Sequence, residues 1–170
     1  MPTKARAMAY ASVASALGVA ALYLGSVLPS ARLSILCAAT LGVAFVKMSC
    51  PGWWSLGCYA VTASLALLLT PDKTLPVLYT LFFGYYPIVK LRAERFSDPR
   101  IRWGVKLGAF HAALGALLLL LRSASFLPSA LEDTALWLLW IGGVVFFLVY
   151  DFVLGKLFLY YLRNIAGRMK

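Results

Sequence analysis

Acidic residues, histidine and cysteine are scarce in this sequence of 170 residues. It holds six aspartates and glutamates, one histidine and three cysteines. We find no metal-binding His-Glu spacing, nucleophile elbow or glycine-rich phosphate loop, which are the groupings that catalysis commonly needs. Cys37, Cys50 and Cys58 lack both the spacing of a zinc site and an even count, so we interpret them as small buried apolar residues. We therefore expect no enzyme, no metal and no cofactor.

Apolar residues, by contrast, make up 62% of the chain, and its mean hydropathy is +0.85. A soluble core of this size cannot bury so much apolar surface, so lipid must be the solvent for most of it. The net charge of +10 could indicate a nucleic-acid partner. The lysines and arginines, however, lie between long apolar runs and not on one solvated face, which argues against nucleic acid.

Six apolar runs are separated by turn-forming residues, and each run is close to the roughly 20 residues that span a bilayer. They cover residues 8–28, 33–48, 53–69, 75–91, 103–121 and 135–159. The first run follows Lys4 and Arg6 as in a signal peptide, but it is long and further spans follow, so we expect an uncleaved helix. The sequence thus predicts an all-α protein, a single domain of about six transmembrane helices.

The basic residues are distributed unequally between the two sides of this predicted bundle. Six crossings place 13 of the 16 lysines and arginines on one side, and only Arg32, Lys73 and Arg122 on the other. Because positive residues near helix ends prefer the cytoplasm, we predict that both termini are cytoplasmic.

Small residues recur every four positions in the first run, at Ala7, Ala11 and Ser15. Such stripes let another helix approach closely in lipid. One interpretation is packing within the chain's own bundle, and the other is a docking face for a partner protein.

Two ionisable residues fall inside predicted spans, His111 in the fifth and Asp151 in the sixth. Both lie about two turns from the same membrane face, so antiparallel helices could pair them at one depth. A hydrogen-bonded pair that fixes helix packing, a contact of Asp151 with Lys106 or Lys90, and a proton relay all stay open.

The connection from Lys90 to Lys106 carries six basic residues against Glu94 and Asp98. It satisfies the preference of positive charge for the cytoplasm, and we expect it to contact anionic lipid headgroups. A docking site for a protein partner is the alternative.

A family resemblance rests on the six short spans and on the Ala7, Ala11 and Ser15 stripe. It also rests on a local run, Pro71-Asp72-Lys73 followed by Leu78-Tyr79-Thr80-Leu81-Phe82-Phe83-Gly84-Tyr85-Tyr86-Pro87 and then Lys90. In these features the chain resembles the substrate-binding S subunit of energy-coupling factor transporters, and related uncharacterised membrane proteins of Gram-positive bacteria. The resemblance implies a bacterial plasma membrane protein that binds a vitamin or similar micronutrient. It also implies a transmembrane coupling subunit and ATPases as partners, with the small-residue stripe facing the coupling subunit.

The ligand of such a subunit lies in the outer half of the bundle. Residues at that level combine charge with aromatic surface, and the candidates are Tyr23, Arg32, Asp72, Lys73, Tyr79 and Phe83. The alternative function is a non-transporting accessory or structural protein that assembles with another membrane protein.

Overall fold

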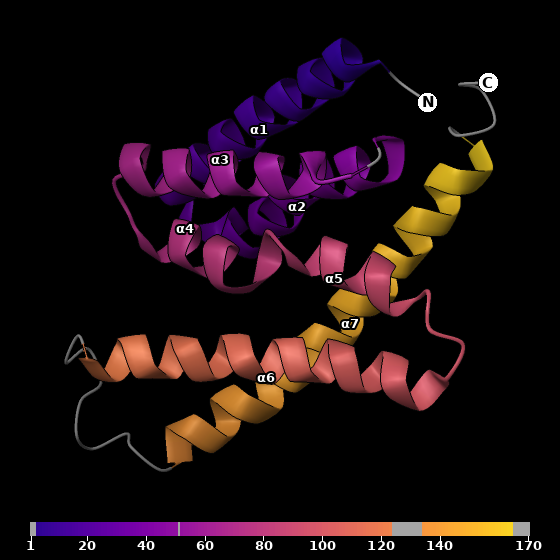
Figure 1. The fold of residues 1–170 in the computed structure, drawn as a ribbon. Helices are drawn as coiled ribbons and strands as arrows, with labels where there is room; N and C mark the ends of the chain where they lie inside the picture. Colours follow the sequence, from indigo (N-terminus) through magenta and orange to yellow (C-terminus); the bar gives the residue numbers. More distant parts are fainter. Residues whose placement is uncertain (1–2, 51, 124–133, 165–170) are drawn as a thin grey trace. The chain divides into compact units, whose positions relative to one another are not determined.

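The computed structural model describes residues 3–50, 52–123 and 134–164, and over these ranges the regular structure is entirely helical (Figure 1). In chain order the elements are α1 (Lys4–Val27), the 3-10 turn η1 (Pro29–Ala31), α2 (Arg32–Ser49), α3 (Trp54–Leu69), α4 (Thr74–Leu78), the π-helical turn η2 (Tyr79–Phe83), α5 (Tyr86–Ala93), α6 (Pro99–Ser123) and α7 (Thr134–Asn164). The predicted all-α class is confirmed.

Four stretches within the described ranges are long and apolar enough to cross a bilayer. They are α1, α2, the Pro99–Leu120 part of α6 and the Trp140–Tyr160 part of α7. Helix α3 is apolar but has only 16 residues, which is shorter than the usual span of about 20. These helices are those of an integral membrane protein, and six crossings stay a prediction.

The chain divides into two compact units, residues 1–117 and 118–170. In the first unit, helices α1, α2 and α3 pack against one another, and α4, η2 and α5 lie along them. The second unit contains the end of α6 and the whole of α7. The prediction of a single domain over residues 1–170 stays a prediction.

Helix α1 begins and ends where local chemistry requires it. The Thr3 hydroxyl accepts a hydrogen bond from the Arg6 backbone N–H at 3.4 Å, which caps the first turn. At the other end the Leu28 N–H still donates to Leu24, but Pro29 has no N–H to continue the ladder. The proline thus separates α1 from α2.

The face that α1 turns into the bundle carries mostly small residues. Its buried positions are Ala7, Ala14, Ser15, Gly18, Leu22 and Gly25. Larger apolar side chains such as Val13 and Leu17 point outward and are more than 60% exposed. Small residues inside and large apolar residues outside are the pattern expected when lipid surrounds the helices, because close packing and not water exclusion holds them together.

Two close approaches set how α1 packs. A Cβ atom added to Gly18 would lie 2.9 Å from the Thr62 methyl group on α3. One added to Gly25 would lie 2.8 Å from a Leu75 methyl group and 3.0 Å from one of Ile35. Glycine therefore lets α1 contact α2, α3 and α4 along its length.

The fourth predicted span, residues 75–91, is not one regular helix. The Gly84 N–H donates to the Tyr79 carbonyl, five residues earlier, at 2.7 Å. This hydrogen bond defines a π-helical turn between α4 and α5. Pro76 near the start of α4 and Pro87 near the start of α5 lack N–H donors, so the helical ladder weakens on both sides of the turn. The sequence did not indicate this interruption, and a crossing over residues 75–91 stays a prediction.

The π-helical turn leaves a carbonyl without its helical partner, and α3 supplies a new one. In an α-helix the Gly84 N–H would donate to the Thr80 carbonyl. Here the Tyr59 hydroxyl of α3 donates to that carbonyl instead, at 2.8 Å. Helix α3 thus stabilises the turn through a single side chain.

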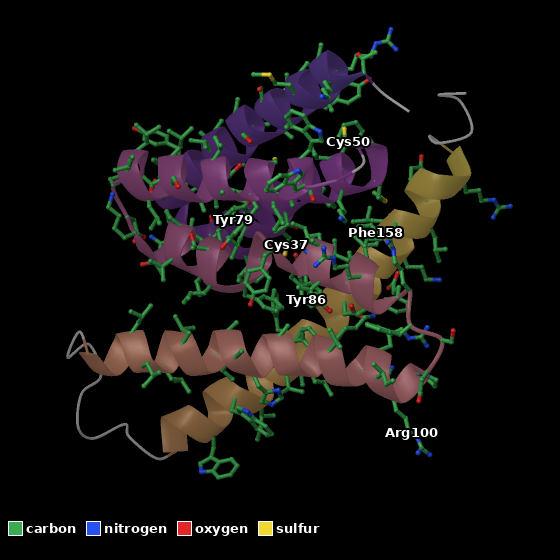
Figure 2. All side chains as sticks on the ribbon, in the orientation of Figure 1. Cys37, Cys50, Tyr79, Tyr86, Arg100 and Phe158 are labelled. Carbon is green, nitrogen blue, oxygen red and sulfur yellow. The ribbon has the colours of Figure 1, made fainter. Side chains whose placement is uncertain are left out.

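Aromatic rings surround this turn. Tyr79 and Tyr86, labelled in Figure 2, are fully buried. The Phe82 ring lies 4.8 Å from that of Tyr86 and 5.8 Å from that of Phe110 on α6. Ring contacts of this kind stabilise packing beyond the area they bury, so the turn is held by aromatic side chains where backbone hydrogen bonds are fewer.

Candidate functional site

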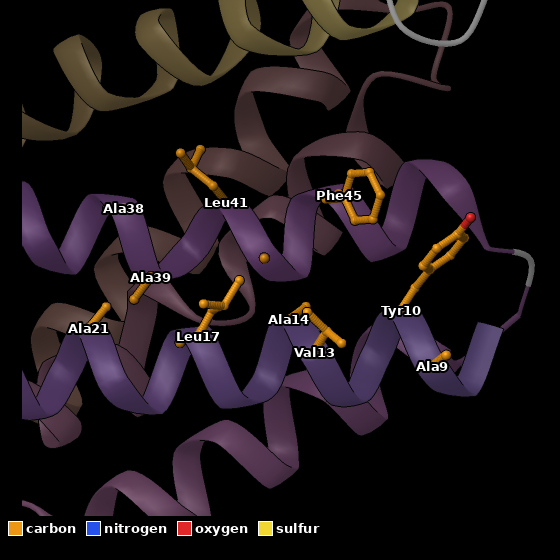
Figure 3. Close-up of a pocket in the computed structure, with 12 residues that line it drawn as sticks. Ala9, Tyr10, Val13, Ala14, Leu17, Ala21, Ala38, Ala39, Leu41 and Phe45 are labelled. Carbon is orange, nitrogen blue, oxygen red and sulfur yellow. The ribbon is translucent and has the colours of Figure 1, made fainter. Parts of the chain in front are cut away.

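An apolar groove of about 780 Å³ runs between α1 and α2 (Figure 3). Every residue along it is apolar or aromatic: Ala9, Tyr10, Val13, Ala14, Leu17, Gly18, Ala21, Ala38, Ala39, Leu41, Gly42 and Phe45. Small residues predominate, with Ala21 and Ala38 towards one end. No charged residue lines the groove, so a binding partner that fits it must present an apolar surface.

Helices α1 and α2 come very close to each other along the floor of the groove. A Cβ atom added to Gly42 would lie 3.1 Å from the carbonyl oxygen of Ala14 and 3.4 Å from its methyl group. At the other end the Tyr10 ring meets the Phe45 ring edge-on, with centroids 5.7 Å apart. The aromatic pair closes the groove at that end (Figure 3).

The α2 side of this groove was not among the predicted site residues. The second run contains Ala38 and Gly42 four positions apart, with Ala39 beside them. This spacing is the same small-residue pattern that we noted in the first run. It would have indicated the groove had both runs been compared.

The predicted docking stripe of α1 lies away from the groove. Ala7 and Ser15 are buried, and Ala11 is partly exposed. The Ser15 hydroxyl lies 3.3 Å from the Cys58 carbonyl of α3, to which it donates. Packing inside the bundle therefore accounts for Ser15, and docking onto this stripe stays a prediction.

Three of the predicted ligand residues form ion pairs or hydrogen bonds between helix ends. Arg32 at the start of α2 forms an ion pair with Asp72, with Nη2 and Oδ2 2.9 Å apart. The Asp72 carboxylate also accepts from the backbone N–H of Thr74, the first residue of α4, at 2.9 Å. Lys73 donates to the Leu67 and Thr70 carbonyls, both at 2.7 Å, at the end of α3. The structure brings Arg32 and Asp72 into direct contact, and Lys73 follows next in the chain, so we call these three residues the Arg32–Asp72–Lys73 cluster.

The remaining predicted ligand residues lie elsewhere. Tyr23 is about half exposed on α1. Tyr79 and Phe83 are buried in the π-helical turn. Within the described residues, the Tyr79 hydroxyl and the Arg32 Nε atom are buried without a hydrogen-bond partner. A role in ligand binding stays a prediction for all six residues.

His111 and Asp151 lie in different units of the chain. His111 is exposed on α6, and its Nδ1 lies 2.8 Å from the Leu107 carbonyl, which requires the ring proton on Nδ1. Asp151 is buried in α7. Their predicted pairing stays a prediction.

The Glu94 carboxylate at the end of α5 lies close to the ammonium groups of two buried lysines. Its Oε1 atom lies 3.4 Å from the Lys90 Nζ and 3.5 Å from the Lys106 Nζ. Lys90 and Lys106 are only 2% and 5% exposed. A carboxylate shared in this way offsets part of the cost of burying two ammonium groups.

Metal binding has no support in the part of the chain that the structure describes, where no three histidine, cysteine or acidic side chains cluster. Cys50 and Cys58 are buried and Cys37 is partly buried, all three as free thiols. No family model, curated protein or solved structure matches this sequence.

The Arg32–Asp72–Lys73 cluster predicts a specific pH dependence. Hydrogen bonds from Thr74, together with the Arg32 charge, hold the pKa of the Asp72 carboxyl below its usual value. The stabilisation is therefore complete above the ordinary aspartate pKa of about 4 and is lost as the pH falls through the lower folded-state value. We expect Asp72→Asn to lower the unfolding midpoint at pH 7, and we expect this difference from the unmodified protein to be smaller at pH 3. A difference between the two proteins that is equal at both pH values would contradict this assignment.

Proposed function

We propose that this protein is a subunit of a membrane complex, and that a transmembrane helix of its partner lies in the α1–α2 groove. The observation that carries the proposal is the groove itself, about 780 Å³ in volume and apolar along its whole length. Both of its walls belong to helices long enough to span a bilayer. An apolar helix is the occupant that matches this shape, because the ridge of one helix packs into a groove between others.

The small residues of the floor favour a helix as the occupant. Ala9, Ala21 and Ala38 line the groove and are not buried, so their small side chains let a third backbone come close. The dispersion attraction between closely packed backbones drives helix association in lipid. Leu17 and Val13 stand exposed beside this floor, where they can pack against both flanks of an incoming helix. The topology that we propose with this function is six crossings with both termini cytoplasmic, supported by the distribution of lysine and arginine.

Micronutrient uptake together with that partner is the second candidate function. It is favoured by two of the three described buried polar atoms that have no hydrogen-bond partner: the Tyr79 hydroxyl and the Arg32 Nε lie on residues of the predicted ligand set, while the third, the Ser55 hydroxyl, does not. A buried polar atom left unpaired costs about 1–3 kcal/mol, and a bound polar ligand could recover this free energy. In this form of the proposal the partner is a coupling subunit, ATPases supply the energy, and the membrane is a bacterial plasma membrane.

Filling the groove should abolish assembly. Ala38 is exposed and lines the groove, so Ala38→Trp places an indole where the partner helix would lie. We expect the tagged variant, purified from native membranes in mild detergent, to lose at least nine-tenths of a membrane protein that co-purifies with the unmodified chain. Ala60 is an exposed alanine of α3 outside the groove, and Ala60→Trp should retain that protein.

The same purification separates the candidate functions. A photoreactive residue in place of Leu17 should crosslink to the co-purifying protein if its helix occupies the groove. Crosslinks to lipid alone, or equal recovery with Ala38→Trp and Ala60→Trp, would refute the assembly proposal. ATPases in the complex, with a small molecule bound to the purified chain, would support uptake; a complex with neither would leave assembly as the function.

A further inference from the structure

The apolar groove between α1 and α2 has two unlike ends. On α1 the residues that line it run from Ala9 to Ala21 and follow the helical repeat of about 3.6 residues, so they share one face. Beyond Ala21 this face continues through Leu24, which is exposed. Before Ala9 it continues through Arg6, three residues from Ala9 and four from Tyr10. A helix in the groove would therefore meet apolar side chains at one end and a cation at the other.

The polar end is the one that the ring pair of Tyr10 and Phe45 closes (Figure 3). Arg6 is exposed one helical turn before Tyr10. Lys47 is partly exposed two residues after Phe45, in the last turn of α2. Tyr10 itself is 36% exposed, and its hydroxyl points away from the rest of the groove in Figure 3. This end thus offers two cations and a hydroxyl next to an apolar surface.

The chain's own carboxylates do not neutralise this end. The Asp72 carboxylate pairs with Arg32, and that of Glu94 lies against the two buried lysines. Within the residues that the structure describes, Arg6 and Lys47 form no ion pair. The group that complements this end is therefore an anion. Because the groove beside it accepts an apolar helix, an acidic side chain on that same helix supplies the anion at the right place.

We infer that the helix in the groove carries an aspartate or glutamate one turn beyond its crossing of the Tyr10–Phe45 pair, and that this carboxylate pairs with Arg6. The inference rests on the function proposed above and adds the partner's chemistry. Arginine matches a carboxylate through two parallel N–H donors, and the Tyr10 hydroxyl supplies a further donor. The acidic residue also sets the direction of the partner helix, because the reverse direction would take the carboxylate away from Arg6 to the apolar end at Leu24.

The experiment uses the full chain in phosphatidylcholine nanodiscs and synthetic transmembrane helices as probes. Each probe is an apolar peptide of about 20 leucines and alanines, with glycine at every fourth position of its centre. One probe carries glutamate in its first turn and another carries it in its last turn, which covers both chain directions. Each has a counterpart with glutamine in place of glutamate. Energy transfer between labelled protein and labelled peptide measures the affinity.

The test variant is Arg6→Gln, and its matched control is Lys4→Gln. Lys4 is exposed in the same first part of α1, but two residues away it lies on nearly the opposite side of the helix. Both substitutions remove one positive charge from the same end of the chain. Only Arg6→Gln removes it from the face that lines the groove.

We expect one glutamate peptide to bind the unmodified protein about fivefold more tightly than its glutamine counterpart. Arg6→Gln should reduce this preference to less than about twofold, and Lys4→Gln should retain it. Equal affinity for glutamate and glutamine peptides would overturn the inference. An equal loss of preference in both variants would overturn it in favour of a diffuse charge effect. Loss of the preference in phosphatidylglycerol nanodiscs would overturn it in favour of a lipid phosphate at Arg6.

The Ala38→Trp variant separates failure of this inference from failure of the proposed function. It fills the groove and should abolish binding of every peptide. If glutamate and glutamine peptides bind equally and Ala38→Trp abolishes both, the groove accepts a helix and only the acidic residue is refuted. If no peptide binds, or if Ala38→Trp leaves binding unchanged, the proposed function and this inference fail together.

Discussion

The Gly84→Val variant is expected to lose about 3 kcal/mol of unfolding free energy, or to fail to reach the native fold. A Cβ atom at this position would lie 2.5 Å from the Tyr59 ring and 2.7 Å from the Tyr79 ring. Neither ring can easily give way. Tyr79 is fully buried, and Tyr59 is held by its hydroxyl bond to the Thr80 carbonyl.

The expected loss combines two physical effects. Overpacking of a filled interior costs about 1–3 kcal/mol. Displacing Tyr59 also leaves the Thr80 carbonyl unpaired, which costs about 1–3 kcal/mol for a buried acceptor. The free energy of unfolding in mixed micelles, followed by helical circular dichroism, measures the sum.

Gly57→Val is the matched control for this prediction. Gly57 lies in α3 with no atom within 4 Å of an added Cβ, so the same substitution there tests helix propensity without overpacking. A loss at Gly84 no larger than at Gly57 would show that the π-helical turn accommodates a side chain, against the close packing described above.

The Gly42→Leu variant is expected to separate α1 from α2 and to cost about 2 kcal/mol of unfolding free energy. An added Cβ would meet the carbonyl oxygen of Ala14 at 3.1 Å. Because this neighbour is backbone, no rotamer change can relieve the contact, and whole helices must shift. The groove floor would be lost with the close approach, so partner binding should fall together with stability.

The control for this second substitution is Gly104→Leu in α6, where an added Cβ meets nothing within 4 Å. Disulfide trapping between cysteines placed at positions 13 and 41 reports the separation of α1 and α2 directly. Unchanged trapping efficiency in Gly42→Leu would mean that α2 absorbs the leucine without moving, and the prediction would fail.

The sequence alone was sufficient for the fold class and for most helix boundaries. The run predicted over residues 8–28 lies within one residue of the end of α1 at Val27, and that over residues 33–48 lies within α2. The reason is physical: a backbone in lipid must satisfy its own hydrogen bonds, so long apolar runs can only be helices, and prolines and polar residues mark their ends.

The broken fourth run shows where that reasoning stops. Residues 75–91 have the hydropathy of one span, but Pro76, Pro87 and the π-helical turn divide it. Hydropathy does not report which helical hydrogen bonds form. The Tyr59 hydroxyl that replaces a lost one comes from another helix, 21 residues away from Thr80.

The candidate sites were predicted less completely than the helices. Three of the charged residues expected to hold a ligand, Arg32, Asp72 and Lys73, form polar contacts between helix ends, and their ligand binding stays a prediction. The position of a residue within an apolar run predicts its depth in the membrane. The partner of a charged side chain depends instead on which helix ends lie close together, and the sequence of one run does not contain that information.

By itself, then, the sequence determined an all-α membrane protein with basic connections, because composition and spacing suffice when the solvent is lipid. Only the tertiary structure decided that α1 and α2 form an apolar groove at Ala14 and Gly42, and that Tyr59 of α3 donates to the Thr80 carbonyl in the π-helical turn. Both features arise where helices distant in sequence come together, and the angle and depth of such contacts depend on the shapes of all the side chains between them.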